Sequence, residues 1–296
     1  MRRSLAFIHR WAGLVLLLYV LMICLSGSAL VYRNELYRHF SPQPIPVQPA
    51  GALLTDEGLK AAAERAFPGY VAKQMWRGKQ PNHAVEVQLS KGDKTRTRLI
   101  DPYQGNDLGA SLPAGYRFTT FLMKLHADLL QGPTGRVVNG VIALSFLLMS
   151  ITGMMIWRPR NRKDPSSVKL SIRRLHMTVG IWVAAFVLMW GITGSHLAFP
   201  QIVATIVDFV EPLDPEDPVE RFGDHVSYWL AYLHFGRIGG RVSWCERGTC
   251  NEIFKAIWAV IALMPVFLAA TGIIAWSRRY RPVHKTITSE AVAGRP

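Results

Sequence analysis

LAFIHRWAGLVLLLYVLMICLSG, from Leu5 to Gly27, carries a histidine near its start and continues as an apolar run. The chain repeats this pattern from Ile172 to Gly194, as IRRLHMTVGIWVAAFVLMWGITG. In both stretches one glycine follows the histidine after four residues and another after 18 residues. The matching residues are His9, Gly13 and Gly27 in the first stretch, and His176, Gly180 and Gly194 in the second. Equal offsets in two apolar helices indicate a duplicated unit, and the glycines leave room for a flat group against the helices.

Half of the 296 residues are hydrophobic, and many of them gather in four long runs without Asp, Glu, Lys or Arg. A membrane-spanning helix needs about 20 such residues, so each run is long enough to cross a bilayer. The predicted spans are Trp11–Tyr32, Val137–Trp157, Met177–Phe199 and Ala256–Ser277. The net charge of +14 comes from basic residues beside these runs. We therefore expect the lipid bilayer, and no nucleic acid, as the partner of this charge.

The charges beside the runs predict how the chain crosses the membrane. Basic residues flank the first run, fill the connection between the second and third, and follow the fourth. The connection from Pro200 to Glu252 is acidic, with nine acids and four bases. Because basic loops stay in the cytoplasm, we expect both termini and the middle loop inside and the two long connections outside. The expected segments are 1–32 (first span), 33–135 (outside), 136–158 (span), 159–176 (basic loop), 177–199 (span), 200–255 (acidic loop), 256–277 (span) and 278–296 (tail).

The first outer connection contains a predicted small α+β domain at about 51–110. Thr55 is a good N-cap for a helix that ends near Phe67, with two acids in its first turn. Three short strand-like runs follow, at Val71–Trp76, Ala84–Leu89 and Thr95–Ile100. One helix on a small antiparallel sheet is an α+β unit.

A second motif also occurs twice, with a histidine before an apolar run and a glycine near the end of that run. His126 precedes the second span, which ends near Gly153, and His234 precedes the fourth span, which ends near Gly272. The chain is therefore predicted to be an all-α four-helix membrane bundle of two repeated two-span hairpins, with the α+β domain outside the membrane. Both hairpins enter from the cytoplasm, so the copies are parallel repeats.

Four histidines at matching repeat positions predict a cofactor site, although a single histidine at a membrane boundary is usually an interfacial residue. His9 and His176 are expected at the cytoplasmic ends of spans, and His126 and His234 at the outer ends. Eighteen residues make about five whole helical turns, so Gly27 lies on the helix face that carries His9. Packing of helices on small residues explains the glycines but not their phasing with histidine.

Two neutral imidazoles on opposite sides of one iron make a bis-histidine haem site, which favours electron transfer over oxygen chemistry. We expect two haems stacked across the bilayer. The inner haem is assigned the ligands His9 and His176, with clearance from Gly153 and Gly272; the outer haem is assigned His126 and His234, with clearance from Gly27 and Gly194. Because no C-x-x-C-H motif occurs, both haems are expected to be non-covalent and b-type.

Several further residues are candidates beside these sites. Three arginines are placed to meet haem propionates or to act only as topology charges: Arg10, Arg136 and Arg174. His196 has no counterpart in the first copy, and either replaces an outer ligand or contacts substrate. Cys245 and Cys250 are expected in an oxidising compartment, where they can form a disulfide.

The order of these motifs resembles the PepSY-associated transmembrane proteins. The resemblance covers nearly the whole chain: His-x-x-x-Gly entering the first span, an outer domain closing in Asp101-Pro-Tyr-Gln-Gly105, Leu-His before the second span, and Thr-Gly followed by Trp-x-Arg at its end. It implies a bacterial inner-membrane, multi-pass protein of a functionally mixed family whose members include di-haem ferric-siderophore reductases. Carried over by position, the ligands are His9, His126, His176 and His234.

The leading hypothesis is therefore a haem-dependent membrane oxidoreductase that reduces a ferric siderophore or similar Fe(III) chelate outside the cytoplasm. No nucleotide-binding motif appears, so a quinol or a cytoplasmic partner protein is expected as the electron donor. The alternative is a non-enzymatic, membrane-anchored PepSY binding or regulatory protein, in which the histidines are incidental. A transporter ranks last, since transporters usually carry charges or broken helices within the membrane.

Overall fold

The computed structural model describes residues 2–157, 171–213, 221–237 and 249–280. The chain divides into two compact units, one formed by Met1–Val31 with Lys124–Pro296 and the other by Tyr32–Met123. Most of the predicted basic loop, Cys245 and the tail beyond residue 280 lie outside the described residues. The expectations for these segments stay predictions.

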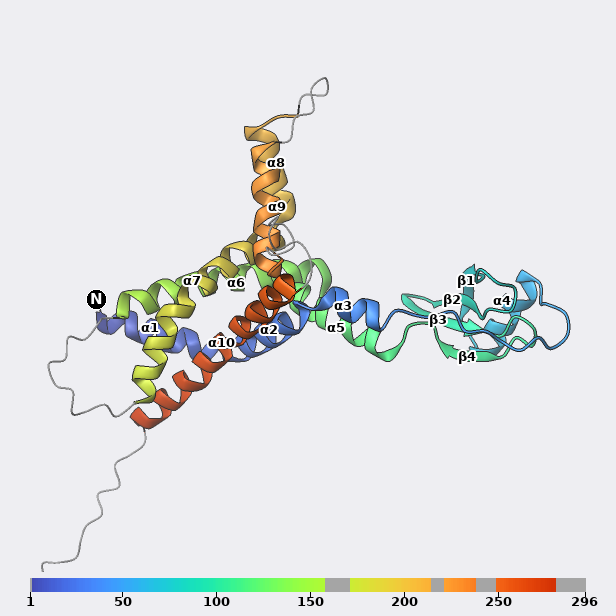
Figure 1. The fold of residues 1–296 in the computed structure, drawn as a ribbon, viewed down its shortest axis with the longest axis horizontal. Helices are drawn as coiled ribbons and strands as arrows, with labels where there is room; N and C mark the ends of the chain where they lie inside the picture. Colours follow the sequence, from blue (N-terminus) through green and yellow to red (C-terminus); the bar gives the residue numbers. More distant parts are fainter. Residues whose placement is uncertain (1, 158–170, 214–220, 238–248, 281–296) are drawn as a thin grey trace, which may run out of the picture. The chain divides into compact units, whose positions relative to one another are not determined.

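The first unit is helical and contains the apolar runs (Figure 1). Its helices are α1 (Arg2–Val15), α2 (Leu17–Leu30), the end of α5 (Ala114–Asp128), α6 (Gly132–Ile156), α7 (Ile172–Ala198), α8 (Pro200–Val210), α9 (Phe222–Phe235) and α10 (Thr249–Tyr280). In the described chain, α6, α7 and α10 are long and apolar enough to cross a membrane, and the bent pair α1 and α2 makes a fourth if it is one span. These helices confirm a mostly helical membrane protein. The grouping into two repeated hairpins stays a prediction.

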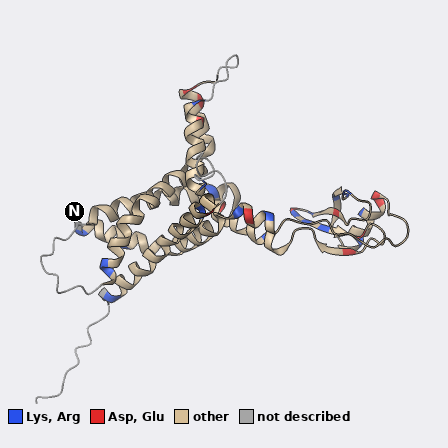
Figure 2. Ribbon diagram, in the orientation of Figure 1, with Lys and Arg blue, Asp and Glu red and all other residues tan. Residues whose placement is uncertain are grey.

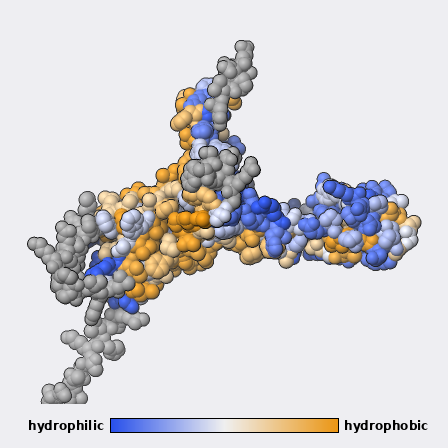
Figure 3. Space-filling view, viewed as in Figure 1, coloured by the Kyte–Doolittle hydropathy of each residue, from blue (hydrophilic) through white to orange (hydrophobic). Residues whose placement is uncertain are grey.

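The long helices pack against one another and leave an apolar outer surface. Helix α6 packs on α7, α10 packs on α2 and α7, and α1 packs on α6. Small hydroxyl residues join them: Ser150 donates to the Ala184 carbonyl at 3.0 Å, and Ser28 to the Ala259 carbonyl at 2.9 Å. Figure 2 shows Lys and Arg near the ends of the spans, and Figure 3 shows hydrophobic residues covering their length. This distribution is typical of helices in lipid.

The first span differs from the expected uninterrupted helix. Helices α1 and α2 are bent by 62° at a short break. The hydrogen-bonded path nevertheless continues, since the Leu16 N–H bonds to the Ala12 carbonyl at 2.9 Å and the Val20 N–H to the Leu16 carbonyl at 2.8 Å. No proline lies at this position, so the apolar pattern alone predicts no bend here.

The helices that contain the other predicted spans begin before the apolar runs, in polar flanking sequence. Ser171 caps α7 by accepting a hydrogen bond from the Arg174 N–H at 3.2 Å, which starts this helix before its apolar run. Helix α10 begins at Thr249 and continues through Pro265, as membrane helices can when neighbouring groups satisfy the freed carbonyl. Helices α8 and α9, in the connection between α7 and α10, were not predicted.

The second unit contains α3 (Arg33–His39), α4 (Asp56–Ala66) and an antiparallel sheet in the order β1-β2-β3-β4. The strands are β1 (Val71–Trp76), β2 (Val85–Lys91), β3 (Lys94–Ile100) and β4 (Asp107–Ala110). The predicted helix, its Thr55 cap and three of these strands are confirmed, whereas β4 was missed. Helix α4 covers the sheet with a core of Leu59, Ala63, Val85, Val87, Leu89 and Ile100.

The Asp-Pro-Tyr-Gln-Gly segment forms the turn between β3 and β4. The Asp101 carboxylate accepts hydrogen bonds from the Tyr103 N–H at 2.7 Å and the Gln104 N–H at 3.0 Å. Gly105 closes the turn with a φ of 74°, which only glycine adopts without strain. The motif that supports the family resemblance is therefore a structural turn.

Candidate functional site

The four predicted histidines form two pairs within the helical unit. The ring centroids of His9 and His176 are 6.5 Å apart, and those of His126 and His234 are 6.2 Å apart. Helices α1 and α7 supply the first pair, and α5 and α9 supply the second. Each pair therefore joins a residue from the first half of the chain to one from the second half.

Each imidazole lies against a glycine on a neighbouring helix. A Cβ atom on that glycine would lie 3.2 Å from the His9 ring at Gly153, 3.4 Å from the His176 ring at Gly272, 2.8 Å from the His126 ring at Gly27 and 3.5 Å from the His234 ring at Gly194. We expected these four glycines to give clearance to a flat group, and this role stays a prediction. In the structure each histidine ring crosses to the helix beside its own and lies against the glycine there.

A serine or threonine directly before each glycine contacts Nδ1 of the histidine. These hydroxyls are Thr152 at 3.2 Å from His9, Thr271 at 3.0 Å from His176, Ser26 at 3.1 Å from His126 and Thr193 at 2.9 Å from His234. No role was predicted for these hydroxyls. The signal was present, since a hydroxyl residue precedes all four glycines.

These contacts assign the proton of each imidazole to Nδ1. Each hydroxyl donates to a carbonyl four residues earlier on its own helix; Thr193, for example, donates to Met189 at 2.8 Å. Its oxygen is therefore left to accept a proton from histidine. The Met149 carbonyl, 3.2 Å from Nδ1 of His9, and the Ile23 carbonyl, 3.1 Å from Nδ1 of His126, can only accept. Nε2 of each ring is then the unprotonated nitrogen that can bind a metal ion.

The pairs have the spacing that shared metal ligation needs. Two imidazoles that bind one metal ion from opposite sides, through bonds of about 2 Å, have ring centroids about 6 Å apart. Both observed distances, 6.5 and 6.2 Å, are close to this value. Burial also lowers the pKa of His126 to about 4, which keeps its ring neutral near pH 7. Among the described residues no group of three or more His, Cys, Asp or Glu could hold a metal ion, so any metal here rests on pairs.

Arg10 lies beside the first pair and has an unsatisfied buried nitrogen. Its Nε donates to the Ala6 carbonyl at 2.8 Å, while its buried Nη1 has no hydrogen-bond partner among the residues that the structure describes. A buried guanidinium nitrogen without a partner is costly, and an anionic group such as a haem propionate would satisfy it. The donor set around His9 and His176 therefore fits a metal-bearing group that also carries carboxylates.

Side chains from α6 and α10 hydrogen-bond to the ends of the helices that carry His126 and His234. The Asn139 amide donates to the carbonyls of His126 at 2.8 Å and Ala127 at 3.1 Å. Trp258 donates from its indole nitrogen to the Leu233 carbonyl at 3.0 Å. Both residues cap carbonyls at the C-terminal end of a helix, and both stand fourteen residues before their glycines, Gly153 and Gly272.

The remaining predicted residues are not part of the histidine contacts described above. A Cβ at Gly13 would lie 3.6 Å from Met149, and a Cβ at Gly180 would lie 3.8 Å from Leu268, both at ordinary packing distance, so the room that we expected for a flat group stays a prediction. Arg136 is exposed and Arg174 is partly buried. His196 is partly buried in α7 and hydrogen-bonds to the backbone of Ser227 in α9, so the structure places it in helix packing. Cys250 is disulfide-bonded, but Cys245 is outside the described part, and their pairing stays a prediction.

Comparison with known proteins identifies the family of the sequence. The sequence model of the PepSY-associated TM region matches residues 6–221. An uncharacterized protein of Pseudomonas aeruginosa is 29% identical over 115 residues, which cover 33% of this chain and 29% of that protein. The chain thus spans less than a third of the length of this curated relative.

Proposed function

The chain belongs to the PepSY-associated TM region family, and we propose that it is a membrane oxidoreductase that holds two b-type haems between paired histidines. The observation that supports this proposal most strongly is the repeated arrangement of His9 with His176 and of His126 with His234, with centroids 6.5 and 6.2 Å apart. A structural histidine needs only one hydrogen-bond partner. A structural role gives no reason for four imidazoles to meet in pairs.

The chain's own groups would prepare these histidines for ligation. Hydrogen bonds from Nδ1 to Thr152, Thr271, Ser26 and Thr193 orient the rings and increase the basicity of Nε2. His9 with His176 and His126 with His234 would hold the haems, which would supply one-electron transfer when bound. The unpartnered Nη1 of Arg10 would bind a propionate of the first haem.

The duplicated motifs support two copies of a two-span hairpin related by an axis along the membrane normal. In this arrangement His9 and His176 lie at the cytoplasmic side, and His126 and His234 at the outer side. Both termini then face the cytoplasm of a bacterium, and the unit from Tyr32 to Met123 faces the periplasm. The two histidine pairs would carry electrons across the inner membrane.

We propose a ferric siderophore or similar Fe(III) chelate as the electron acceptor. Oxygen donors hold the hard Fe(III) ion tightly and hold Fe(II) less tightly, so one-electron reduction releases the iron. Two electron donors suit this chain, a membrane quinol or a cytoplasmic protein, since the sequence has no dinucleotide-binding G-x-G-x-x-G motif.

An optical spectrum of the purified protein, with haem counted per chain, tests this function. The proposal predicts a low-spin b-type spectrum, about two haems per chain, and reoxidation of the dithionite-reduced protein by added Fe(III) chelate. A colourless protein from haem-replete cells contradicts the proposal. The alternative of a membrane-anchored PepSY binding or regulatory module would then be the better account. A two-haem protein that Fe(III) chelates do not reoxidise would keep the electron-transfer role and exclude this acceptor.

A further inference from the structure

Helices α8 and α9 form a hairpin whose apolar face has no partner in the described chain. Helix α8 exposes Ile202, Ile206, Phe209 and Val210, with Phe209 85% exposed, and Leu213 and Phe222 beside it are also exposed. The polar residues Gln201, Thr205 and Asp208 follow the same helical spacing on the adjoining face. The hairpin is therefore amphipathic, with a distinct apolar side and a distinct polar side.

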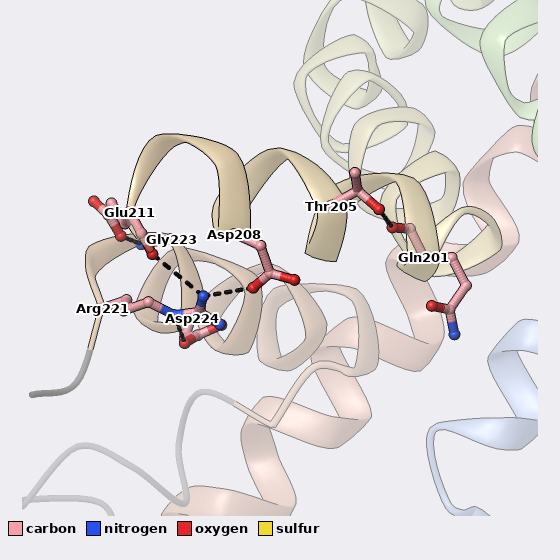
Figure 4. Close-up of polar contacts among 7 residues, drawn as sticks. All are labelled: Gln201, Thr205, Asp208, Glu211, Arg221, Gly223 and Asp224. Atoms are coloured by element: carbon pink, nitrogen blue, oxygen red, sulfur yellow. Dashed lines mark hydrogen bonds and ion pairs between the residues drawn. The ribbon is translucent and has the colours of Figure 1, made fainter. Parts of the chain in front are cut away.

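The charged groups of the hairpin are joined in one network (Figure 4). Arg221 donates to Asp208 in α8 at 2.6 Å and to Asp224 in α9 at 2.7 Å. The Glu211 carboxylate accepts from the Gly223 N–H at 2.8 Å. Hydrogen bonds to Asp224 and Asp208 also raise the pKa of Arg221, so its charge is fixed. These contacts tie α8 to α9 and keep charge off the apolar face.

The place of the hairpin in the helical unit relates this face to the bilayer. Helix α8 begins at Pro200, two residues after α7 ends at Ala198. Helix α9 ends beside α7, where His234 meets Thr193 at 2.9 Å. Both ends of the hairpin therefore lie at the outer end of a membrane-spanning helix. In Figure 1, α8 and α9 run across the direction of the spans rather than along it.

We propose that the α8–α9 hairpin lies on the outer surface of the membrane, with its apolar face inserted among the lipid headgroups and upper acyl chains. Its apolar residues continue the lipid-facing surface of the spans (Figure 3). Amphipathic helices of this kind bury their apolar face about 5–10 Å into the interface. The proposal rests on the exposed apolar residues of the hairpin and on the proposed topology, and it does not require haem.

The charges of the hairpin specify the kind of lipid contact. Asp208, Glu211 and Asp224 outnumber Arg221 in the described hairpin, so anionic headgroups do not attract it. Apolar burial is the driving force, and insertion is expected to be equal in zwitterionic and in anionic bilayers.

Nitroxide labels on the full chain in nanodiscs test this proposal. Phe209→Cys marks the apolar face and Thr205→Cys is the matched control on the polar face, both in a Cys24→Ala background labelled without reductant. In phosphatidylcholine nanodiscs, the label at 209 should collide with oxygen dissolved in lipid and be protected from a water-soluble nickel chelate, while the label at 205 shows the reverse. Adding phosphatidylglycerol should change neither ratio.

Three results would overturn the proposal. Equal exposure of both labels to the nickel chelate would place the apolar face in water. Protection of the label at 209 from both reagents would indicate a second copy or another protein on this face. Insertion only in the presence of phosphatidylglycerol would contradict burial driven by apolar contact. Haem counted on the same samples separates these results from failure of the electron-transfer function.

Discussion

In the first half of the chain Tyr19 donates a hydrogen bond to Asn139 at 2.5 Å, whereas in the second half Phe186 and Trp258 meet through their rings, with centroids 5.9 Å apart. Tyr19 and Phe186 each stand ten residues after their histidines, His9 and His176. The two halves therefore place different chemistry at the same position. Both keep a donor to a carbonyl at the end of the helix that carries an outer histidine. Both halves therefore have a side-chain hydrogen bond to the end of the helix that carries His126 or His234.

The two halves also differ in their backbone and their connections. The first half begins with α1 and α2, which are bent by 62°, and the second begins with the unbroken α7. The connection between α2 and α6 carries a unit with its own core, and the connection between α7 and α10 carries the α8–α9 hairpin. Each of the four histidines nevertheless contacts a hydroxyl residue and the glycine that follows it, at distances that differ between the halves. The paired histidines therefore tolerate large differences around them.

The largest difference between the halves is expected at equivalent glycines. Gly27→Ala would bring a Cβ within 2.8 Å of the His126 ring, whereas Gly194→Ala would leave 3.5 Å to His234. Overpacking of this size costs about 1–3 kcal/mol, and His126 is expected to be displaced. Gly27→Ala should reduce haem content from two to about one per chain, while Gly194→Ala keeps both. Equal haem contents in the two variants would show that the glycines do not set the histidine positions.

Removing a hydroxyl should weaken one haem without removing its ligand. Thr193→Val deletes the oxygen that lies 2.9 Å from Nδ1 of His234. Loss of such a contact typically reduces metal affinity by about 10–100-fold. Competition with a haem-binding apoprotein measures this loss, and Thr193→Ser, which keeps the hydroxyl, should restore the affinity. If Thr193→Ser is as weak as Thr193→Val, the threonine acts through packing alone.

The hydrogen bonds from Asn139 and from Trp258 are expected to contribute differently to the stability of the protein. Asn139→Leu leaves the His126 and Ala127 carbonyls and the Tyr19 hydroxyl without this partner, at a cost of about 1–3 kcal/mol. Trp258→Phe removes one N–H donor to Leu233 and keeps a ring against Phe186, at about 0.5–1.5 kcal/mol. Thermal unfolding in detergent should therefore show the larger decrease in Tm for Asn139→Leu. A larger decrease in Tm for Trp258→Phe would mean that packing of the indole ring stabilises the protein more than the hydrogen bonds of Asn139 do.

The smallest effect on stability is expected in the unit from Tyr32 to Met123, which has no counterpart among the described residues of the second half. Hydrogen bonding from Arg98, at 2.9 Å from its Nε, holds the pKa of Asp107 below its ordinary value. This contact therefore stabilises the unit above the unfolded-state pKa of aspartate, and its contribution is lost as pH falls through the lower folded-state pKa. Both side chains are partly exposed, so the contribution is at most about 1 kcal/mol. Asp107→Asn should make the decrease in Tm at acid pH smaller. If Tm decreases as much in the variant as in the wild type, the Arg98–Asp107 pair does not cause this decrease.

The spans, the helix–sheet unit and the four histidines follow from the sequence because each depends on a local pattern. Apolar length identifies α6, α7 and α10, and the Thr55 cap marks α4. The pairing of His9 with His176 could be predicted because duplication implies an axis between the copies. Strand β4 is short, with four residues, and its contribution to the sheet comes only from pairing with β3.

Other features depend on contacts that no local pattern contains. The bend at Leu16 has no proline to mark it. The contact between Gly27 and the His126 ring could not be predicted either, because the two residues are 99 positions apart in the sequence. Helices α8 and α9 lie in a connection whose acids predicted only its side of the membrane, and two of those acids, Asp208 and Asp224, bind Arg221.

Haem counted on single and double histidine variants tests the central claim most directly. The account predicts two haems per chain in the wild type and one in each of His9→Ala, His176→Ala, His126→Ala and His234→Ala. The double variant His9→Ala with His176→Ala should still hold one haem, because both changes empty the same site. The double variant His9→Ala with His126→Ala should hold none. One haem in this last variant, or none in the former, would contradict the pairing of histidines across the two halves.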